Sequence, residues 1–167
     1  MKYKNAIMVM VFFILSVYAN AFTQEDPEFV GGNSLGILIP GGDLEETYTV
    51  GLGFYGHLDY NLNKNFALRL DLGWNDIVGE ETEYTDSEGK IRVNHPERTI
   101  WELTAGVRAQ YSFIYIEGRG GYFFGLNEFG YVPAAGIRFW KIDLQGNYAF
   151  AGDNEYALVR IAYYWKK

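Results

Sequence analysis

The chain has 167 residues, of which 18% are aromatic, 20 are glycine and none is cysteine, and its formal net charge is −7. This length favours one domain, and the lack of cysteine excludes disulfides and thiolate metal sites. The acidic balance argues against nucleic acid as a partner, because such binding depends on cations that neutralise phosphates.

The N-terminal residues 1–21 have the features of a secretory signal peptide. Two lysines precede an apolar stretch over residues 6–17, and residues 19–21 (Ala-Asn-Ala) have the small-x-small pattern of a cleavage site. The apolar stretch is shorter than the roughly 20 residues that a membrane-spanning helix needs. We therefore expect a cleaved signal peptide, a flexible lead over residues 22–28 and a folded domain over residues 29–165.

The clearest periodic pattern covers residues 48–62. Every second residue from Tyr48 to Leu62 is apolar or aromatic except Gly56, and the residues between them are mostly polar or small. A period of two predicts a β-strand, because successive side chains point to opposite faces. The run exceeds the roughly 5–6 residues usual in soluble proteins and suits the roughly 9–11 residues of a membrane-spanning strand.

The same alternation recurs along the chain and predicts about eight strands. In chain order they cover residues 29–39, 48–62, 66–75, 100–112, 114–123, 132–139, 142–148 and 156–165. By their breakers and charge, the connections are tight turns at 63–65, 112–113 and 140–141, longer breaks at 40–46, 76–98 and 125–131, and a short loop at 151–154. The fold class predicted is all-β, an eight-stranded antiparallel up-and-down transmembrane β-barrel.

The break at 76–98 is rich in acids and is expected to be a surface loop, which can extend its flanking strands as a ribbon. It could bind divalent cations, but it lacks the alternating ligands and the glycine of a tight calcium loop. A solvated run of charges is the simpler interpretation.

Alternation alone does not decide which face of the barrel is outside. A soluble lipocalin-like barrel would turn its apolar face inward, whereas a membrane barrel turns it outward. Lysines after the signal peptide all lie in turns, loops or the tail, and the polar strand faces carry arginine with carboxylates, which suits buried pairs. The expected lumen charge network consists of His57, Asp59, Arg69, Asp71, Glu102, Arg108, Glu117, Arg119, Arg138, Asp143 and Arg160.

Aromatic residues gather at both ends of the apolar faces and also favour the membrane. The expected girdles are Tyr60, Phe66, Tyr111, Phe139 and Trp165 at the tight-turn end, with Tyr48, Trp74, Trp101, Tyr122 and Tyr148 at the other. Tight turns at one end and longer loops at the other are the asymmetry of such barrels.

Two functional interpretations of the interior remain beside a packed polar core. Arginines that exchange carboxylate partners could gate a very small pore, but an eight-stranded barrel is only wide enough to be filled by side chains. His57 and Asp59 share a face and could form a base and its orienter in a lipid-modifying enzyme, but no serine accompanies them on the strand. The sequence therefore predicts a filled lumen, no catalytic activity, no metal site and no cofactor.

Over residues 29–165 the chain resembles the small eight-stranded outer-membrane β-barrel proteins of the OmpA/OmpX-like superfamily. Four stretches carry this resemblance. They are residues 54–60 (FYGHLDY), 103–108 (LTAGVR), 135–139 (AGIRF) and 159–165 (VRIAYYW). Members usually end on an aromatic residue that the barrel-insertion machinery reads, whereas here Lys166 and Lys167 follow Trp165.

This resemblance implies a location in the bacterial outer membrane, with both termini periplasmic. Outer-membrane lipid and lipopolysaccharide would surround the barrel, and the barrel-insertion machinery would be a partner during biogenesis. The implied role is structural or lies in surface interaction through extracellular loops 76–98 and 124–131, with a partner that the sequence does not identify.

Overall fold

The computed structural model describes residues 28–86, 89–94 and 96–165. The predicted signal peptide, most of the flexible lead and the two C-terminal lysines lie outside these residues. No helix among the described residues is long and apolar enough to span a membrane. The strands are β1 (Glu28–Gly42), β2 (Tyr48–Asn61), β3 (Phe66–Gly79), β4 (Glu81–Asp86), β5 (Gly89–Asn94), β6 (Arg98–Tyr111), β7 (Ile114–Phe124), β8 (Glu128–Phe139), β9 (Ile142–Ala151) and β10 (Asn154–Tyr164).

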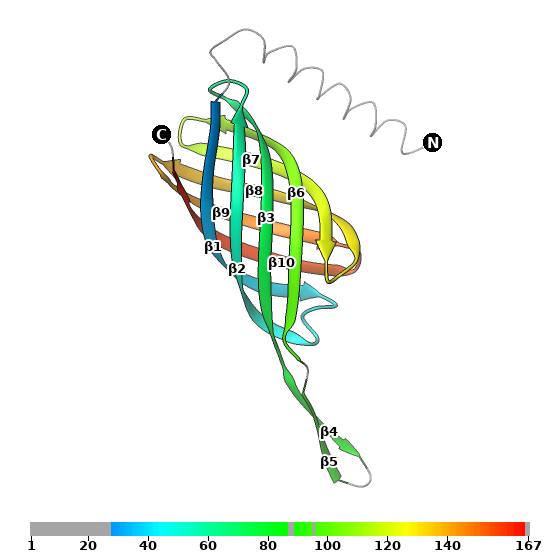
Figure 1. Cartoon of the computed structure of the whole chain (residues 1–167). Coiled ribbons are helices and arrows are strands. Elements are labelled where there is room, and N and C mark those ends of the chain that lie inside the picture. The colour runs from blue at the N-terminus through cyan, green and yellow to red at the C-terminus, as the bar shows by residue number, and fades with distance from the viewer. Residues whose placement is uncertain (1–27, 87–88, 95, 166–167) are drawn as a thin grey trace, which may run out of the picture.

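Eight of these strands form a closed antiparallel barrel in the order β1-β10-β9-β8-β7-β6-β3-β2 (Figure 1). Neighbouring strands around the ring are mostly neighbours in sequence, and β1 closes the barrel by pairing with β10 from Gly32–Tyr164 to Gly42–Asn154. Every strand of the barrel therefore forms backbone hydrogen bonds with a neighbour on both sides, as a strand in lipid requires. The predicted all-β eight-stranded barrel is confirmed.

The alternation of the sequence becomes an alternation of outward and inward side chains. On β2, Leu52 and Phe54 are 58% and 48% exposed, whereas Tyr55, His57 and Asp59 are at most 5% exposed. The outer wall is thus apolar and the interior carries the charges. This is the arrangement expected of a barrel in lipid and the reverse of a soluble ligand-carrying barrel.

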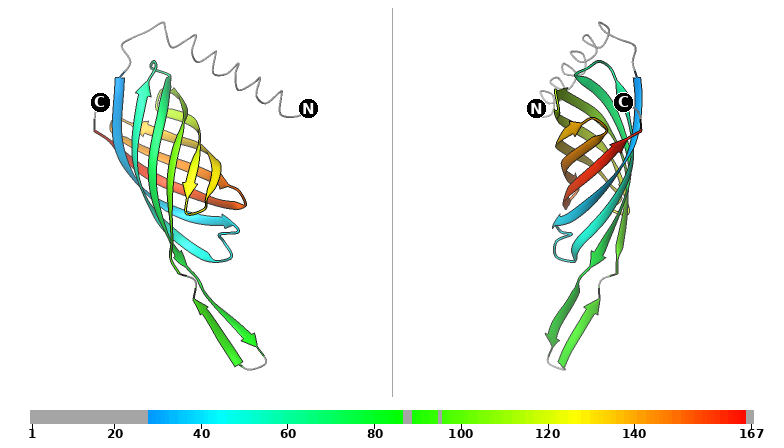
Figure 2. Two further views of the ribbon diagram at one scale, coloured as in Figure 1. Left: turned by 45° about the vertical axis from the view of Figure 1, so that its right-hand side comes forward. Right: turned by 90° about the vertical axis from the view of Figure 1, so that its left-hand side faces the viewer.

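Tight turns join the strands at the end of the barrel where β1 starts and β10 finishes. Residues 112–113 and 140–141 form two-residue turns, in which Ser112 and Trp140 adopt φ values of 58° and 56°. We call this the turn end. Beyond the opposite end, β4 and β5 form a separate two-stranded sheet that projects away from the barrel (Figure 2). We call this sheet the ribbon and the opposite end the ribbon end.

Several predicted boundaries were wrong at the ribbon end. β8 begins at Glu128, so the predicted loop at 124–131 is only a turn at residues 125–127, where Gly125 and Asn127 have φ values of 90° and 59°. The break at 76–98 is mostly strand, because it holds the end of β3, the ribbon and the start of β6. The sequence allowed this break to extend its flanking strands as a ribbon, and β4 and β5 form one.

An apolar cluster fills the interior at the ribbon end, where the sequence predicts only loops and strand ends. Its largest fully buried members are Leu38, Leu44, Ile77, Ile100, Phe123 and Tyr156. Leu44 comes from the β1–β2 loop, and the others are inward residues of five strands. This cluster, the apolar cap, lies beside the charged part of the lumen and excludes water from that end.

Candidate functional site

Charged side chains converge in the lumen because each occupies an inward position of its strand. Five arginines come from β3, β6, β7, β8 and β10, and five carboxylates come from β2, β3, β6, β7 and β9. The arginines are Arg69, Arg108, Arg119, Arg138 and Arg160, and the acids are Asp59, Asp71, Glu102, Glu117 and Asp143. Equal numbers of each sign allow the lumen to be filled without net charge.

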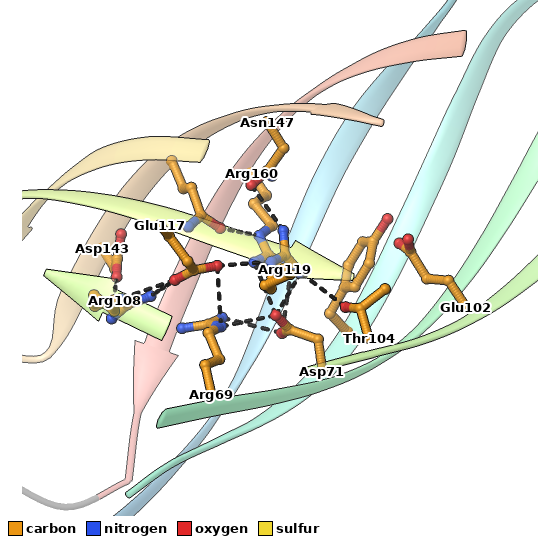
Figure 3. Close-up of polar contacts among 12 residues, drawn as sticks. Arg69, Asp71, Glu102, Thr104, Arg108, Glu117, Arg119, Asp143, Asn147 and Arg160 are labelled. Carbon is orange, nitrogen blue, oxygen red and sulfur yellow. Dashed lines mark hydrogen bonds and ion pairs between the residues drawn. The ribbon is translucent and has the colours of Figure 1, made fainter. Parts of the chain in front are cut away.

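Asp71 is the centre of one half of this network (Figure 3). Its carboxylate accepts hydrogen bonds from Arg69 on the same strand, at 2.7 and 3.1 Å. Arg119 of β7 and Arg160 of β10 reach the same carboxylate from other walls of the barrel. Because both partners of each pair are almost completely buried, these contacts are protected from solvent screening.

Glu117 on β7 links this half to the turn end. Its carboxylate lies 2.8 Å from Nη2 of Arg108, 2.7 Å from Nε of Arg119 and 3.6 Å from Nε of Arg69. Arg108 also contacts Asp59, at 3.2 Å. Arg69, Arg108 and Arg119 each contact more than one carboxylate, so the pairs form one connected cluster.

Tyr164 on β10 completes the network at the turn end. Its hydroxyl accepts hydrogen bonds from Arg69 and Arg108 at 2.9 Å each, and from Arg138, and it donates to Asp143 at 3.2 Å. The guanidinium of Arg138 also lies 3.8 Å from the centre of the Tyr164 ring, a stacking contact that favours arginine over lysine.

Glu102 is held differently, next to the apolar cap. It accepts hydrogen bonds from Asn75 at 3.2 Å and from the Tyr156 hydroxyl at 3.1 Å. The Tyr55 hydroxyl in turn donates to Asn75 at 2.6 Å. Amide and phenol groups thus donate hydrogen bonds to this carboxylate at the boundary between the charged network and the apolar cap.

The network makes the lumen a packed core. Removing charges from water is costly, and the cost is recovered only when the charges are paired and hydrogen-bonded. Nine of the ten charged side chains named above are at most 5% exposed as residues, and Arg138 is the most exposed, at 16% of its side chain. Because each buried charge is held by partners from other strands, the network favours a rigid interior.

His57 does not form the pair with Asp59 that a base and its orienter require. Neither of its buried ring nitrogens has a hydrogen-bond partner in the described part of the chain, and its ring instead lies 4.6 Å from that of Tyr164. Asp59 accepts from Arg69, Arg108 and Arg138. No group of three or more metal-ligating side chains occurs among the residues that the structure describes.

Of the residues proposed for the girdles, Tyr48 packs against the apolar cap, next to an irregularity in the pairing of β2 with β3. The others lie on the outer wall, with varied exposure. Trp101, Tyr111, Phe139, Tyr148 and Trp165 are 37–83% exposed, and the other four are partly buried against neighbours. Trp74 stacks on Phe54, with 5.7 Å between the ring centres, and its ring centre lies 6.5 Å from that of Trp101. Further outer aromatic residues near the two ends, which the predicted girdles do not include, are Phe29, Phe113, Phe124, Phe129, Tyr131 and Phe150.

Uncharged inward residues, which the predicted charge network did not include, also serve the network. They are Tyr55, Asn75, Thr104, Tyr115, Gln145, Asn147, Tyr156 and Tyr164, all inward and hydrogen-bonded to it or to one another. They could have been recognised from their position along the strand, because each lies an even number of residues from a charged inward residue of the same strand.

No family model matches this sequence, and a search of curated proteins gave no significant match. Solved structures do match. The crystal structure of Ail, the attachment invasion locus protein of Yersinia pestis, is 12% identical and superposes with a TM-score of 0.54, covering 84% of this chain and 99% of Ail. A crystal structure of Ail with the heparin analogue sucrose octasulfate gives the same values.

The structure of Ail in a phospholipid bilayer nanodisc is 14% identical, with a TM-score of 0.50 over 83% of this chain and all of that one. At this identity the likeness concerns the fold. It agrees with the sequence resemblance, since both point to a small eight-stranded barrel of the transmembrane type.

Proposed function

We propose that this protein is an integral barrel of the bacterial outer membrane with a filled, non-conducting lumen. In this proposal it has a structural or surface-interaction role, with the ribbon presented outside the cell. The observation that carries the proposal is the inversion of the barrel, with apolar side chains outside and paired charges inside. Outer-membrane lipid, including lipopolysaccharide, would contact the outer wall, and the barrel-insertion machinery would act during biogenesis.

The connections support the proposed orientation. Short turns are typical of the periplasmic end of these barrels and longer segments of the outer end. Here the turn end carries tight turns and the start of β1, and the ribbon projects from the other (Figures 1 and 2). Both ends of the barrel chain would then be periplasmic, with the ribbon at the cell surface.

The ribbon is the part of the described chain best suited to meet a partner. Its two strands pair from Glu81–Asn94 to Asp86–Gly89, and no third strand joins them in the described structure. Unpaired strand edges can accept an extended segment of another protein through main-chain hydrogen bonds. A two-stranded sheet is only marginally stable alone, so an added strand would stabilise it.

Fractionation tests the location. We expect the mature protein in the outer-membrane fraction, extracted only by detergent, with a band whose gel migration changes on heating. Recovery in the periplasm without detergent would contradict the proposal.

Epitope insertion tests the orientation. A tag inserted between β4 and β5 should be labelled by antibody on intact cells, and the matched tag at the 140–141 turn only after permeabilisation. The opposite pattern would reverse the proposed orientation and leave the location intact.

A further inference from the structure

A groove crosses the outer wall of the barrel from β9 through β10, β1, β2 and β3 to β6. Its volume is about 690 Å³, which lies within the roughly 300–1,000 Å³ of small-molecule sites. Two rows of cross-strand neighbours border it. One row is Ile142, Tyr163, Asn33, Gly56 and Leu72, and the other is Ile161, Leu35, Phe54, Trp74 and Trp101.

A missing side chain creates part of this groove. Gly56 is the outward glycine that interrupts the apolar face of β2, and a Cβ atom built there would have no neighbour within 4 Å. The outward residues on either side along β2, Phe54 and Leu58, are large. Glycine at this position therefore leaves a depression between the large apolar side chains of β2.

Asn33 places an amide at the edge of the depression. It is exposed on the outer wall and is the cross-strand neighbour of both Gly56 on β2 and Tyr163 on β10. The next outward residues of β1 are Leu35 and Ile37. An amide in hydrocarbon is unfavourable unless it finds a hydrogen-bond partner, so its presence here calls for a ligand that supplies one.

We propose that this groove binds one acyl chain of a membrane lipid, and that Asn33 hydrogen-bonds a hydroxyl substituent on that chain. The apolar rows fit the methylene groups, and an amide can both donate to and accept from a hydroxyl. The groove is continuous with the outer wall that lipid covers under the proposed function, on which this inference rests. A second barrel is a poorer occupant, because its convex wall would leave the depression over Gly56 unfilled.

Native mass spectrometry of the purified protein in detergent tests the proposal. The two probes are a phospholipid with one hydroxylated tetradecanoyl chain and the same phospholipid without the hydroxyl. We expect the wild-type protein to retain one molecule of either probe, with about three- to tenfold preference for the hydroxylated one, as one added hydrogen bond would give. Failure to retain either probe, or equal retention of both, would overturn the proposal.

Three variants assign the effect to the groove. Gly56→Leu fills the depression and should abolish retention of both probes, whereas Asn33→Leu should retain both and lose the preference. Gly146→Leu is the matched control, because Gly146 is also outward with nothing within 4 Å of an added Cβ and does not line the groove. Wild-type behaviour of Gly56→Leu, or a preserved preference in Asn33→Leu, would refute the assignment.

The variants are first checked for heat-dependent migration and for insertion into liposomes. A wild-type protein that does not insert would refute the proposed membrane location. Insertion without probe retention would refute only the groove.

Discussion

Asp59 on β2 and Arg138 on β8 stand on opposite walls of the barrel, four strands apart around the ring, yet Oδ2 of Asp59 lies 3.1 Å from Nη2 of Arg138. The hydroxyl of Tyr164 and the carboxylate of Asp143 meet the same guanidinium. Side chains therefore span the whole width of the lumen at this level. Further along the barrel axis, the apolar cap fills the ribbon end.

A lumen spanned in this way should not conduct ions. We expect no steady channels when the purified protein is inserted into a planar bilayer, because an ion would have to displace paired charges or the apolar cap. A channel-forming porin added later to the same bilayer provides the positive control. Reproducible single-channel steps from the protein alone would contradict a closed lumen.

Asp71→Asn should destabilise the barrel strongly. The substitution removes a charge that Arg69, Arg119 and Arg160 share, and breaking a buried ion pair from one side costs about 3–5 kcal/mol. Urea unfolding in liposomes measures the loss. Asp153→Asn, at an exposed turn position, is the control and should change stability little; an equal effect of the two variants would show that the buried pairs contribute little.

The sequence predicts the middle of each strand better than its ends, for a physical reason. In the middle of the barrel the outer wall is apolar and the inner wall faces the polar network, so apolar residues alternate with polar or small ones. At the ribbon end both faces are partly apolar: Ile77 and Ile100 are inward and fully buried. β8 was predicted to start at Val132 because Phe129, Gly130 and Tyr131 give no polar phase, although the strand begins at Glu128.

The interior charges could be recognised from their strand phase, but their partners could not. Asp59 lies on β2 and meets Arg138 of β8 only because the barrel closes. The hydroxyl of Tyr164 joins three arginines for the same reason. Such contacts depend on the stagger and diameter of the closed barrel, and alternation along one strand carries no information about either.

Leu70→Arg should impair folding into membranes. Leu70 is an outward residue in the middle of β3, 46% exposed, and an arginine facing lipid near the bilayer midplane costs about 2–4 kcal/mol. Val78→Arg lies on the same strand and face near the ribbon end, where the cost is about 0–1 kcal/mol. The fraction of heat-modifiable protein in liposomes measures both, and equal folding of the two variants would contradict the lipid-facing assignment of this wall.

Glycines on the two walls should respond differently to alanine. At inward Gly106 an added Cβ would collide with the carbonyl oxygen of Gly118 and with Arg119, whereas at outward Gly118 it would meet nothing within 4 Å. Overpacking typically costs about 1–3 kcal/mol, so Gly106→Ala should lower the free energy of unfolding by that amount or more. Gly118→Ala should leave it nearly unchanged, and a reversed order would contradict the assigned phase of β6 and β7.

His57→Leu separates a packing role from a catalytic one. Because no described residue hydrogen-bonds either ring nitrogen, replacing the imidazole with an apolar side chain removes two buried unsatisfied polar atoms. Stability should stay the same or rise by about 1 kcal/mol, and the lipid A profile of cells that carry the variant should match that of the wild type by mass spectrometry. A folded variant with a changed profile, matched by a deletion of the gene, would instead establish a lipid-modifying activity that uses His57.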